Sequence, residues 1–580
     1  MRFGKGPAAA AAAALLVLTA CSGGGDDDGG AAATGFEDCV DDPNGCNSGE
    51  VEQGGEITWV VSQPFGGWNH YQPEGGSVYG LQATTGIYAS VGQWAPSGDW
   101  EWNTDLLTEE PELLSEDPMT WEYRLNPEAT WNDGTPIGIE DFRWAWRMNS
   151  NDEELCADIC RSRDTNPESL IASVEPGDDD STVVITMDEG VASPEWFVAF
   201  EDGLFPAHRA EEEGFDLDTP EGMLESAEWF NETVPDWSGG PFIIEEGDLE
   251  NQVVKVRNEE YYGDPANLDR ITIRFITDEG SWIPALANGE IDGSSPETWN
   301  EDVITQLQDL GTVRTGIGSG GSWEHVDANV EGEWLQDVEL RRAIFTAIDN
   351  DNLAQRAYGG LFPDYELRTN HVFPAGSPFH EDVLTDTGQG SGDTEAALAI
   401  LEDAGYELDG ETLTRDGEAV PPLRLRYTEG HVARATKAEL IQADLAEIGV
   451  TADIQTTDDL GGTLAEQDYD LMLYGWSATP EFGASPEQYW HSESGSNFGG
   501  YADDEVDELV RDAATSTTQE EAAGFVNEAA RIVAEDAYVL PIVDTPVITF
   551  VTQEFTNIRD NNSQSRRALY NQEEWGVAAN

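Results

Sequence analysis

Histidine, cysteine and carboxylate side chains could do chemistry here, but their spacing indicates no catalytic centre. The seven histidines are scattered and never lie at positions i and i+4, so the chain has no zinc-protease helix. It also has no G-x-S-x-G elbow and no phosphate-binding G-x-x-x-x-G-K-[ST] loop. We therefore expect no enzyme, no metal and no cofactor. A glycosidase carboxylate pair among the 116 acidic residues stays an open alternative.

One glycine run has the spacing of a dinucleotide-binding loop. It covers residues 316–321 (GIGSGG). Such a loop must open a helix, and the following residues 322–330 (SWEHVDANV) have no helical pattern. We therefore predict a turn at residues 316–321.

The first 21 residues have the pattern of a secretory signal. Arg2 and Lys5 precede an apolar run, Ala8–Leu18, which is shorter than the about 20 residues needed to span a bilayer. The next residues complete Leu18-Thr19-Ala20-Cys21, which resembles a bacterial lipobox, where the cysteine is lipidated and becomes the first residue. We predict a lipid anchor at Cys21 on the extracytoplasmic face of the cell membrane. The alternative is a plain cleaved signal. Residues 22–55 begin rich in glycine and aspartate and are predicted to be a flexible tether.

Four cysteines remain after Cys21. They form two pairs that are close in sequence, Cys39 with Cys46 and Cys156 with Cys160. In an oxidising compartment this pattern favours two local disulfides. A zinc site made from all four would need two distant pairs to meet, and the spacings are not those of common zinc modules.

The charge balance excludes some partners. Lysine and arginine number 27 against 116 aspartates and glutamates, a net charge of -89. Nucleic-acid phosphates and anionic lipids would repel such a chain. The acidity also suggests work outside the cell in strong salt, which would screen the repulsion between the carboxylates. We expect a monomer.

Strand and helix patterns alternate along the chain and indicate an α/β protein. Strands are predicted at 56–63, 117–125, 181–187, 271–275, 450–455 and 470–475, and helices at 139–148, 337–348, 350–358, 394–404, 432–448, 503–514 and 519–536.

A series of short motifs resembles the peptide/nickel family of bacterial extracellular solute-binding proteins, family 5. The motifs occur in the family's order. They are residues 131–136 (WNDGTP), 238–242 (SGGPF), 258–263 (NEEYYG), 289–292 (GEID), 347–349 (AID), 404–406 (AGY), 468–470 (DYD), 475–476 (GW) and 504–507 (DEVD). Residues 63–69 (QPFGGWN) also resemble an actinobacterial branch that includes a lipoprotein linked to cell-wall mannolipid assembly.

The resemblance implies a type II periplasmic-binding-protein fold, with two main lobes around a ligand cleft and an extra domain. Lobe I would be discontinuous, and the closed cleft would bury a solute that an ABC permease then accepts. The implied boundaries are 56–86, 207–326 and 545–580 for lobe I, 87–206 for the extra domain and 327–544 for lobe II.

We predict that two segments meet across the cleft and bind the ligand, because pockets of this kind combine aromatic walls with a few polar groups. The alternative is that these aromatic residues form the cores of the lobes. The predicted ligand-binding residues are Trp68, Asn69 and Tyr71 from lobe I, and Tyr474, Trp476, Thr479, Glu481, Trp490 and Asn497 from lobe II.

One position departs from the peptide-binding relatives. In those relatives an acidic residue soon after the Gly-Trp pair holds the free amine of the peptide. Here Thr479 stands at that place, and Glu481 is the candidate substitute. We predict that N-acetylation of a bound peptide weakens binding by less than about tenfold, unless Glu481 reaches the amine.

The leading functional hypothesis is therefore a lipid-anchored protein that captures a peptide or similar solute for an ABC importer. The family also carries sugars, nickel complexes and haem, so it does not fix the solute. The alternatives are a regulatory or interaction lipoprotein of envelope assembly on the same scaffold, and an extracellular hydrolase.

Overall fold

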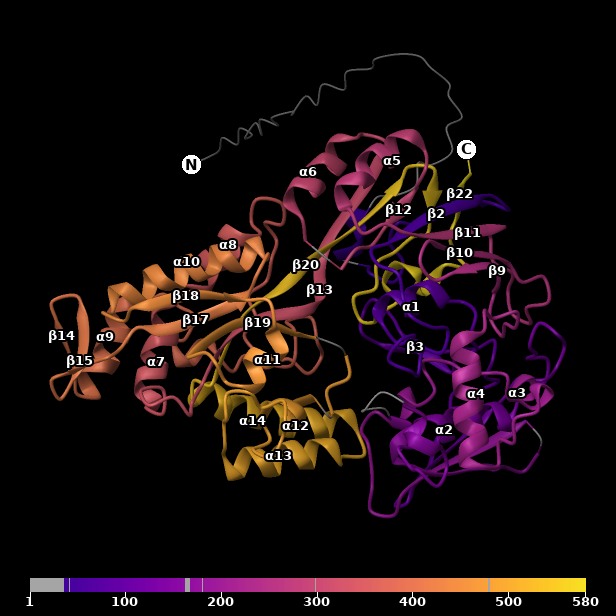
Figure 1. Ribbon diagram of the computed structural model, residues 1–580, viewed down its shortest axis with the longest axis horizontal. Helices are drawn as coiled ribbons and strands as arrows, with labels where there is room; N and C mark the ends of the chain where they lie inside the picture. Colours follow the sequence, from indigo (N-terminus) through magenta and orange to yellow (C-terminus); the bar gives the residue numbers. More distant parts are fainter. Residues whose placement is uncertain are drawn as a thin grey trace, which may run out of the picture.

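The computed structural model describes residues 36–40, 42–161, 167–179, 181–297, 299–477, 480–483 and 485–579. The predicted anchor residue Cys21 lies outside these ranges. Helices and strands alternate through the described chain, as Figure 1 shows. Every helix in this part of the chain is too short or too polar to span a bilayer.

Ten strands in the described residues form one sheet that runs through the molecule, in the order β18-β17-β19-β13-β20-β12-β2-β11-β10-β9. Its two central strands are long, β13 (Val313–Ala328) and β20 (Val539–Thr552), and they pair antiparallel. They cross between the two halves of the molecule (Figure 1). The predicted lobe boundaries at 326/327 and 544/545 fall inside these strands, so the lobes share them.

The lobe II half of the sheet is made of β17 (Leu423–Thr428), β18 (Ala452–Thr457) and β19 (Leu471–Ser477), which run parallel to one another. Four helices pack in the core of this half, through Leu340, Leu353, Leu401 and Ile441. These helices are α7 (Val338–Ala347), α8 (Asn350–Ala357), α9 (Thr394–Asp403) and α10 (Val432–Glu447). After α10, Gly449 has φ +75°, a left-handed conformation that suits glycine and turns the chain towards β18.

Other elements complete this half. They are α11 (Leu460–Ala465), α12 (Ser485–Trp490), α13 (Asp504–Ala514), α14 (Gln519–Glu535) and the small sheet β14 (Tyr406–Asp409), β15 (Thr412–Arg415) and β16 (Glu418–Ala419).

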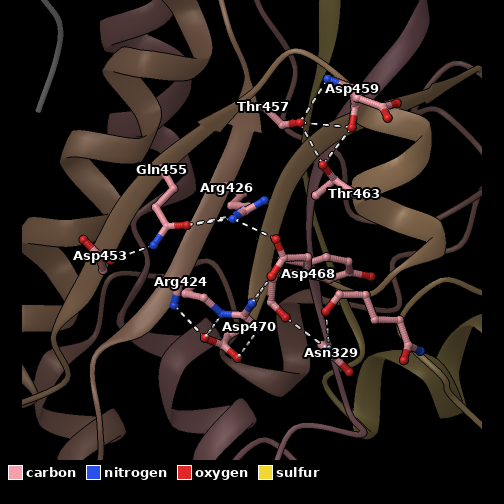
Figure 2. Close-up of polar contacts among 12 residues, drawn as sticks. Asn329, Arg424, Arg426, Asp453, Gln455, Thr457, Asp459, Thr463, Asp468 and Asp470 are labelled. Carbon is pink, nitrogen blue, oxygen red and sulfur yellow. Dashed lines mark hydrogen bonds and ion pairs between the residues drawn. The ribbon is translucent and has the colours of Figure 1, made fainter.

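The D-Y-D motif ties β17 to β19 (Figure 2). Asp470 accepts hydrogen bonds from the backbone N–H and the Nε of Arg424, at 2.7 and 3.1 Å. Asp468 pairs with Arg426 at 2.9 Å, and Arg426 also donates to Gln455 on β18. The motif therefore fixes the start of the strand that leads to the Gly-Trp pair.

The lobe I half contains β2 (Glu56–Val61), which pairs in parallel with β11 (Arg270–Phe275) and β12 (Gly293–Ser294). The antiparallel strands β10 (Gln252–Arg257) and β9 (Phe242–Asp248) extend it. The helices α1 (Val78–Thr84), α5 (Trp282–Asn288) and α6 (Glu301–Asp309) accompany this half (Figure 1).

A separate part carries the sheet β5-β6-β8-β7 and the helices α2, α3 and α4. Its elements are β3 (Gly92–Trp94), β4 (Trp100–Trp102), β5 (Leu113–Glu116), β6 (Met119–Arg124), α2 (Ile139–Asn149), β7 (Ile171–Pro176), β8 (Thr182–Met187), α3 (Ala207–Glu213) and α4 (Pro220–Glu232). One core joins Trp121 and Phe142 to Ala210 and Phe230. The helices α3 and α4, which follow residue 206, therefore pack in the same core as the extra domain. The predicted end of the extra domain at residue 206 falls inside this shared core.

The segment before β2 is not a flexible tether from residue 36 onwards, and this corrects the predicted range 22–55. Cys39 is bonded to Cys46, and Phe36 packs in the lobe I core. The strand β1 (Val51–Glu52) pairs with β22 (Gly576–Ala578), which also pairs with β21 (Phe555–Thr556). Partners on the C-terminal segment hold the described residues of this stretch, which we call the N-terminal strap (residues 36–40 and 42–49). The structure also pairs Cys156 with Cys160, so both predicted disulfides are present.

The predicted strands and helices match observed elements to within two residues at most ends. The glycine run is the exception. Residues 316–321 lie in β13 and are not a turn, so that prediction was wrong. Pairing with β20 explains the difference, because it supplies hydrogen bonds that local glycine chemistry does not reveal.

Candidate functional site

Two paired strands place aromatic residues on one face of the lobe II sheet. Trp323 on β13 lies opposite Trp476 on β19, and His325 lies opposite Tyr474. Because alternate residues of a strand share a face, all four rings gather together. Tyr489 of α12 packs on Trp476 with ring centroids 4.3 Å apart.

Buried polar groups hold this cluster in place. Asp327 accepts a hydrogen bond from the hydroxyl of Tyr474 at 2.6 Å, and its other oxygen lies 2.6 Å from Nδ1 of His325. Burial, and next the charge of Asp327, raise the pKa of Tyr474 well above its ordinary value. Tyr474 therefore stays a neutral donor, and its role is to support the aromatic face.

A cavity of about 40 Å³ opens beside the aromatic face. Trp323 and Tyr489 form aromatic walls, and His371 and Glu481 add polar atoms. The remaining lining residues are Val372, Ser477 and Ser485. A smaller cavity of about 10 Å³ adjoins Trp476 and Trp490. These cavities bring together side chains from β13, β19, α12 and β20 and from the loops that carry His371, Glu481 and Ser496.

The extra domain reaches the same place. Trp94 Nε1 donates a hydrogen bond to Oε1 of Glu481 at 3.1 Å. Glu195, which is 7% exposed, accepts hydrogen bonds from the backbone N–H groups of Phe482 (2.6 Å) and Gly483 (3.1 Å). Burial, and next the charge of Glu481, raise the pKa of Glu195 to about 8. Two separate groups of the extra domain therefore hold the loop that carries Glu481.

The three residues predicted from lobe I lie in the interior instead. Trp68 is 1% exposed and packs edge-on to Phe65. The amide of Asn69 donates to the carbonyl of Ala227 at 3.2 Å and accepts from the N–H of Tyr71 at 3.1 Å. The hydroxyl of Tyr71 donates to the carbonyl of Gly203 at 2.7 Å. This placement favours the core alternative for these residues, and we leave them out of the candidate site.

The residues predicted from lobe II divide into two groups. Trp476, Glu481 and Trp490 line the two cavities. Asn497 is buried. Its side-chain amide donates a hydrogen bond to the carbonyl of Tyr501 at 2.7 Å and accepts one from the hydroxyl of Tyr538 at 2.9 Å, so it stabilises the loop. Thr479 lies outside the described residues.

Sequence reasoning missed Trp323, Tyr489, His371, Trp94 and Glu195. Trp323 follows the glycine run that was predicted to be a turn, and a strand assignment there would have paired it with Trp476. Trp94 and Glu195 come from the extra domain, and Trp94 is 387 positions from Glu481. A local sequence pattern cannot predict a contact between residues so far apart in the chain.

A larger cavity of about 280 Å³ lies elsewhere. Its lining includes Glu101, Asp105, Asp202, Tyr261 and Glu573, and no lining residue comes from lobe II. It is therefore internal to lobe I and the extra domain. Within the described residues, no three histidine, cysteine or acidic side chains are arranged to hold a metal ion.

A sequence model of the bacterial extracellular solute-binding proteins, family 5, matches residues 103–499. The chain belongs to this family. Members are extracytoplasmic solute-binding proteins of ABC transporters and are not enzymes, which confirms the predicted class. The fold is that of the family's periplasmic binding proteins.

Individual relatives are similar over most of the chain. The oligopeptide-binding protein OppA of Mycobacterium tuberculosis is 28% identical over 456 residues, which span 77% of this chain and 72% of that protein. Among solved structures, the periplasmic EDTA-binding protein EppA has a TM-score of 0.82 and 29% identity, covering 93% of this chain and 99% of that one. The oligopeptide-binding protein AppA from Bacillus subtilis, solved with a nonapeptide, has a TM-score of 0.66 and 19% identity, covers 91% of this chain and 100% of that one, and supports the fold alone.

Proposed function

We propose that this chain captures a peptide, or a similar solute, between lobe II and the extra domain and delivers it to an ABC permease. The observation that carries the proposal is the cavity beside Trp323 and Tyr489, where Glu481 is held from the other side by Trp94. Aromatic walls with a few fixed polar groups are typical of solute sites in binding proteins. The named relatives that bind oligopeptides support the peptide class.

The cavity of about 40 Å³ is far smaller than a peptide. We infer that the structure is closed and that the cavity receives only one end or one side chain of the solute. The rest of the solute requires the lobes to separate about the shared strands β13 and β20.

The binding proposal is tested with intact protein stripped of bound solute. Titration calorimetry with a synthetic pentapeptide, Ala-Ala-Lys-Ala-Ala, should give saturable binding. Trp476→Ala should weaken it by at least about tenfold, because the ring that supports Tyr489 is lost. Trp229→Ala, in α4, is the matched control and should leave affinity unchanged. If none of a broad set of synthetic peptides binds, the proposal that the solute is a peptide is refuted.

We further propose that Cys21 carries a diacylglycerol-type anchor on the extracytoplasmic face of the membrane. The support is the Leu18-Thr19-Ala20-Cys21 sequence after an apolar run. Cys21→Ser should release the protein from the membrane fraction or leave the signal uncleaved. Unchanged attachment of that variant would exclude the anchor.

A further inference from the structure

The extra domain and lobe II touch at the loop that carries Glu481. Glu195 of the extra domain accepts hydrogen bonds there from two backbone N–H groups of lobe II, those of Phe482 at 2.6 Å and Gly483 at 3.1 Å. A Cβ added at Gly483 would lie 2.8 Å from Cγ of Pro194 and 3.1 Å from Oε2 of Glu195. The lack of a side chain at Gly483 therefore permits this close approach. We call the contact the latch (Pro194 and Glu195 with Phe482 and Gly483).

Each half of the latch is anchored in its own domain. Phe482 is buried, and its ring packs on Phe373 in a core of lobe II. On the other side, Trp196 directly follows Glu195 and packs on Trp121 in the core of the extra domain. Separation of lobe II from the extra domain would therefore break the latch and leave Glu195 in water.

Glu195 is buried in the latch and faces other carboxyl groups. On the lobe II side lies Glu481, whose Oε1 accepts from Nε1 of Trp94 at 3.1 Å. Burial, and next the charge of Glu481, raise the pKa of Glu195 to about 8, and the two N–H groups and Gln519 at the start of α14 oppose this only in part. Burial, and next the charge of Glu481, also raise the pKa of Glu201 well above its ordinary value.

Further charges of this region lie around Glu201. Asp202 and Glu168 add to the rise in the pKa of Glu201, and Arg566 acts against it. Arg566 lies 3.8 Å from Asp202 and donates to the carbonyl of Glu201 at 2.9 Å. The closed contact thus gathers several carboxyl groups in a partly buried place, which favours the protonated form of the buried ones.

The protonated form suits the latch. A neutral carboxyl group still accepts hydrogen bonds through its carbonyl oxygen, so it can serve the N–H groups of Phe482 and Gly483. In water, by contrast, a glutamate is ionised at neutral pH. We propose that Glu195 is a positioning residue that closes the latch as a neutral acid, so that solute binding takes up a proton. The proton comes from the solvent on closing and returns to the solvent on opening.

This inference rests on the proposed function and adds a regulation to it. The closed form keeps the proton of Glu195 up to about pH 8, whereas the open form loses it near the ordinary pKa of 4.5. Between these values a rise in pH favours the open form. The Kd of the solute should therefore increase by on the order of tenfold for each pH unit, the effect of one proton. A solute captured in acid would be released more readily as the pH rises.

The test is a pH profile of binding to the peptide Ala-Ala-Lys-Ala-Ala. Calorimetry runs from pH 5.5 to 7, where the amines of the peptide keep most of their charge, in 1 M NaCl to screen the acidic surface. Kd for the intact wild type, stripped of bound solute, should rise by on the order of tenfold per pH unit. Glu195→Gln keeps the acceptor and cannot ionise, so its Kd should change by less than about threefold over the range. Glu189→Gln removes an exposed acid of the extra domain and should follow the wild type.

A second measurement counts the protons. Binding heats at pH 6.5 in phosphate and in imidazole, buffers that differ in ionisation enthalpy, should give about one more proton taken up by the wild type than by Glu195→Gln. A merely structural role of Glu195 would weaken the variant at every pH and leave its slope and proton count unchanged. Equal slopes or equal proton counts for the two proteins would overturn the inference.

Gly483→Ala tests the contact without changing an ionisable group. Its Cβ would meet Pro194, so the latch should form poorly. The variant should lose more affinity at pH 5.5, where the wild-type latch is formed, than at pH 7. Equal losses at both pH values would show that this contact does not couple pH to binding.

A measurement without solute separates this inference from the proposed function. If no peptide binds at any pH, small-angle X-ray scattering compares the stripped wild type with Glu195→Gln at pH 5.5 and pH 9. The radius of gyration of the wild type should increase with pH more than that of the variant, because only the wild-type latch ionises. That result would keep the latch and remove the peptide function. The same change in both proteins would remove both.

Discussion

Glu195 is a buried carboxylate with backbone donors as partners and a second carboxylate nearby. Its pKa is raised from 4.5 to about 8, first by burial and then by Glu481. The folded protein therefore holds a proton at Glu195 in the pH range where the unfolded chain has lost it. The contribution of this residue to stability consequently falls as the pH rises from about 5 to 8.

Glu195→Gln should flatten that dependence. A glutamine cannot ionise, and its side-chain oxygen still accepts from the N–H groups of Phe482 and Gly483. Against wild type, the variant should gain stability between pH 5 and pH 8, on the order of 3 kcal/mol. Thermal unfolding at several pH values measures this, with Glu189→Gln, an exposed acid, as the control. Parallel pH profiles for Glu195→Gln and wild type would show that the residue is ionised in the folded protein.

At the residue scale, the sequence located part of the candidate site. Trp476 and Glu481 were predicted from their place at or after the end of a strand; Trp476 lines the smaller of the two cavities and Glu481 the larger. Trp68, Asn69 and Tyr71 also follow a strand, yet α4 and the carbonyl of Gly203 cover them. Whether a loop residue faces the cleft or the core depends on the packing of distant segments, which local patterns do not contain.

At the scale of elements, β13 carries a glycine where β20 comes close. A Cβ added at Gly320 would lie 2.5 Å from the carbonyl oxygen of Thr545 and 2.7 Å from a methyl group of Val547. A backbone oxygen cannot move aside without disturbing the pairing of the two strands. The register shift between Ser319 and Trp323 lies at the same place.

Gly320→Ala should therefore destabilise the protein by about 2 kcal/mol. Gly318→Ala is the matched control, because its nearest neighbour would be the side-chain amide of Asn562 at 3.9 Å. The midpoints of urea unfolding for the two variants measure the difference. Equal midpoints would mean that β13 and β20 can move apart at Gly320 with little loss of stability.

The N-terminal strap is a second element that sequence patterns did not indicate. Glycine and aspartate before it suggested a tether, but Arg559 donates to the carbonyl of Cys46 at 2.9 Å and Phe36 packs on β13 at Gly316. Long-range partners of this kind come from the C-terminal segment. By contrast, the regular helices and strands were predicted well, because their apolar periodicity is local.

Removal of the Cys39–Cys46 bond should loosen the strap. The bond closes a short loop with a sequence separation of 7, so the double variant Cys39→Ser, Cys46→Ser should lose about 2 kcal/mol. Calorimetry gives the change in Tm. The Cys156–Cys160 bond, with a sequence separation of 4, closes a shorter loop, so the double variant that removes it should lose less stability. An unchanged Tm in the first variant would show that the hydrogen bonds of the strap suffice.

At the scale of the whole molecule, a net charge of -89 places many carboxylates within repulsive distance of each other. Salt shortens that range, since the Debye length falls from about 10 Å at 0.1 M to about 3 Å at 1 M. We expect Tm to rise by at least roughly 5 °C between 0.1 and 1 M NaCl and to level off above that. A steady rise with no levelling would point to an effect of salt on apolar surface instead. A falling Tm would contradict the role of charge.

The shared strands also limit how the molecule can be divided. β20 lies between β13 and β12, although it comes last among the strands of the large sheet. A fragment that ends before Val539 would lack a central strand and would leave β13 and β12 with open edges, which invite pairing with other chains. Neither lobe is thus a unit that can be expressed alone, and a polypeptide still being synthesised cannot complete its main sheet until nearly all of its residues have been made.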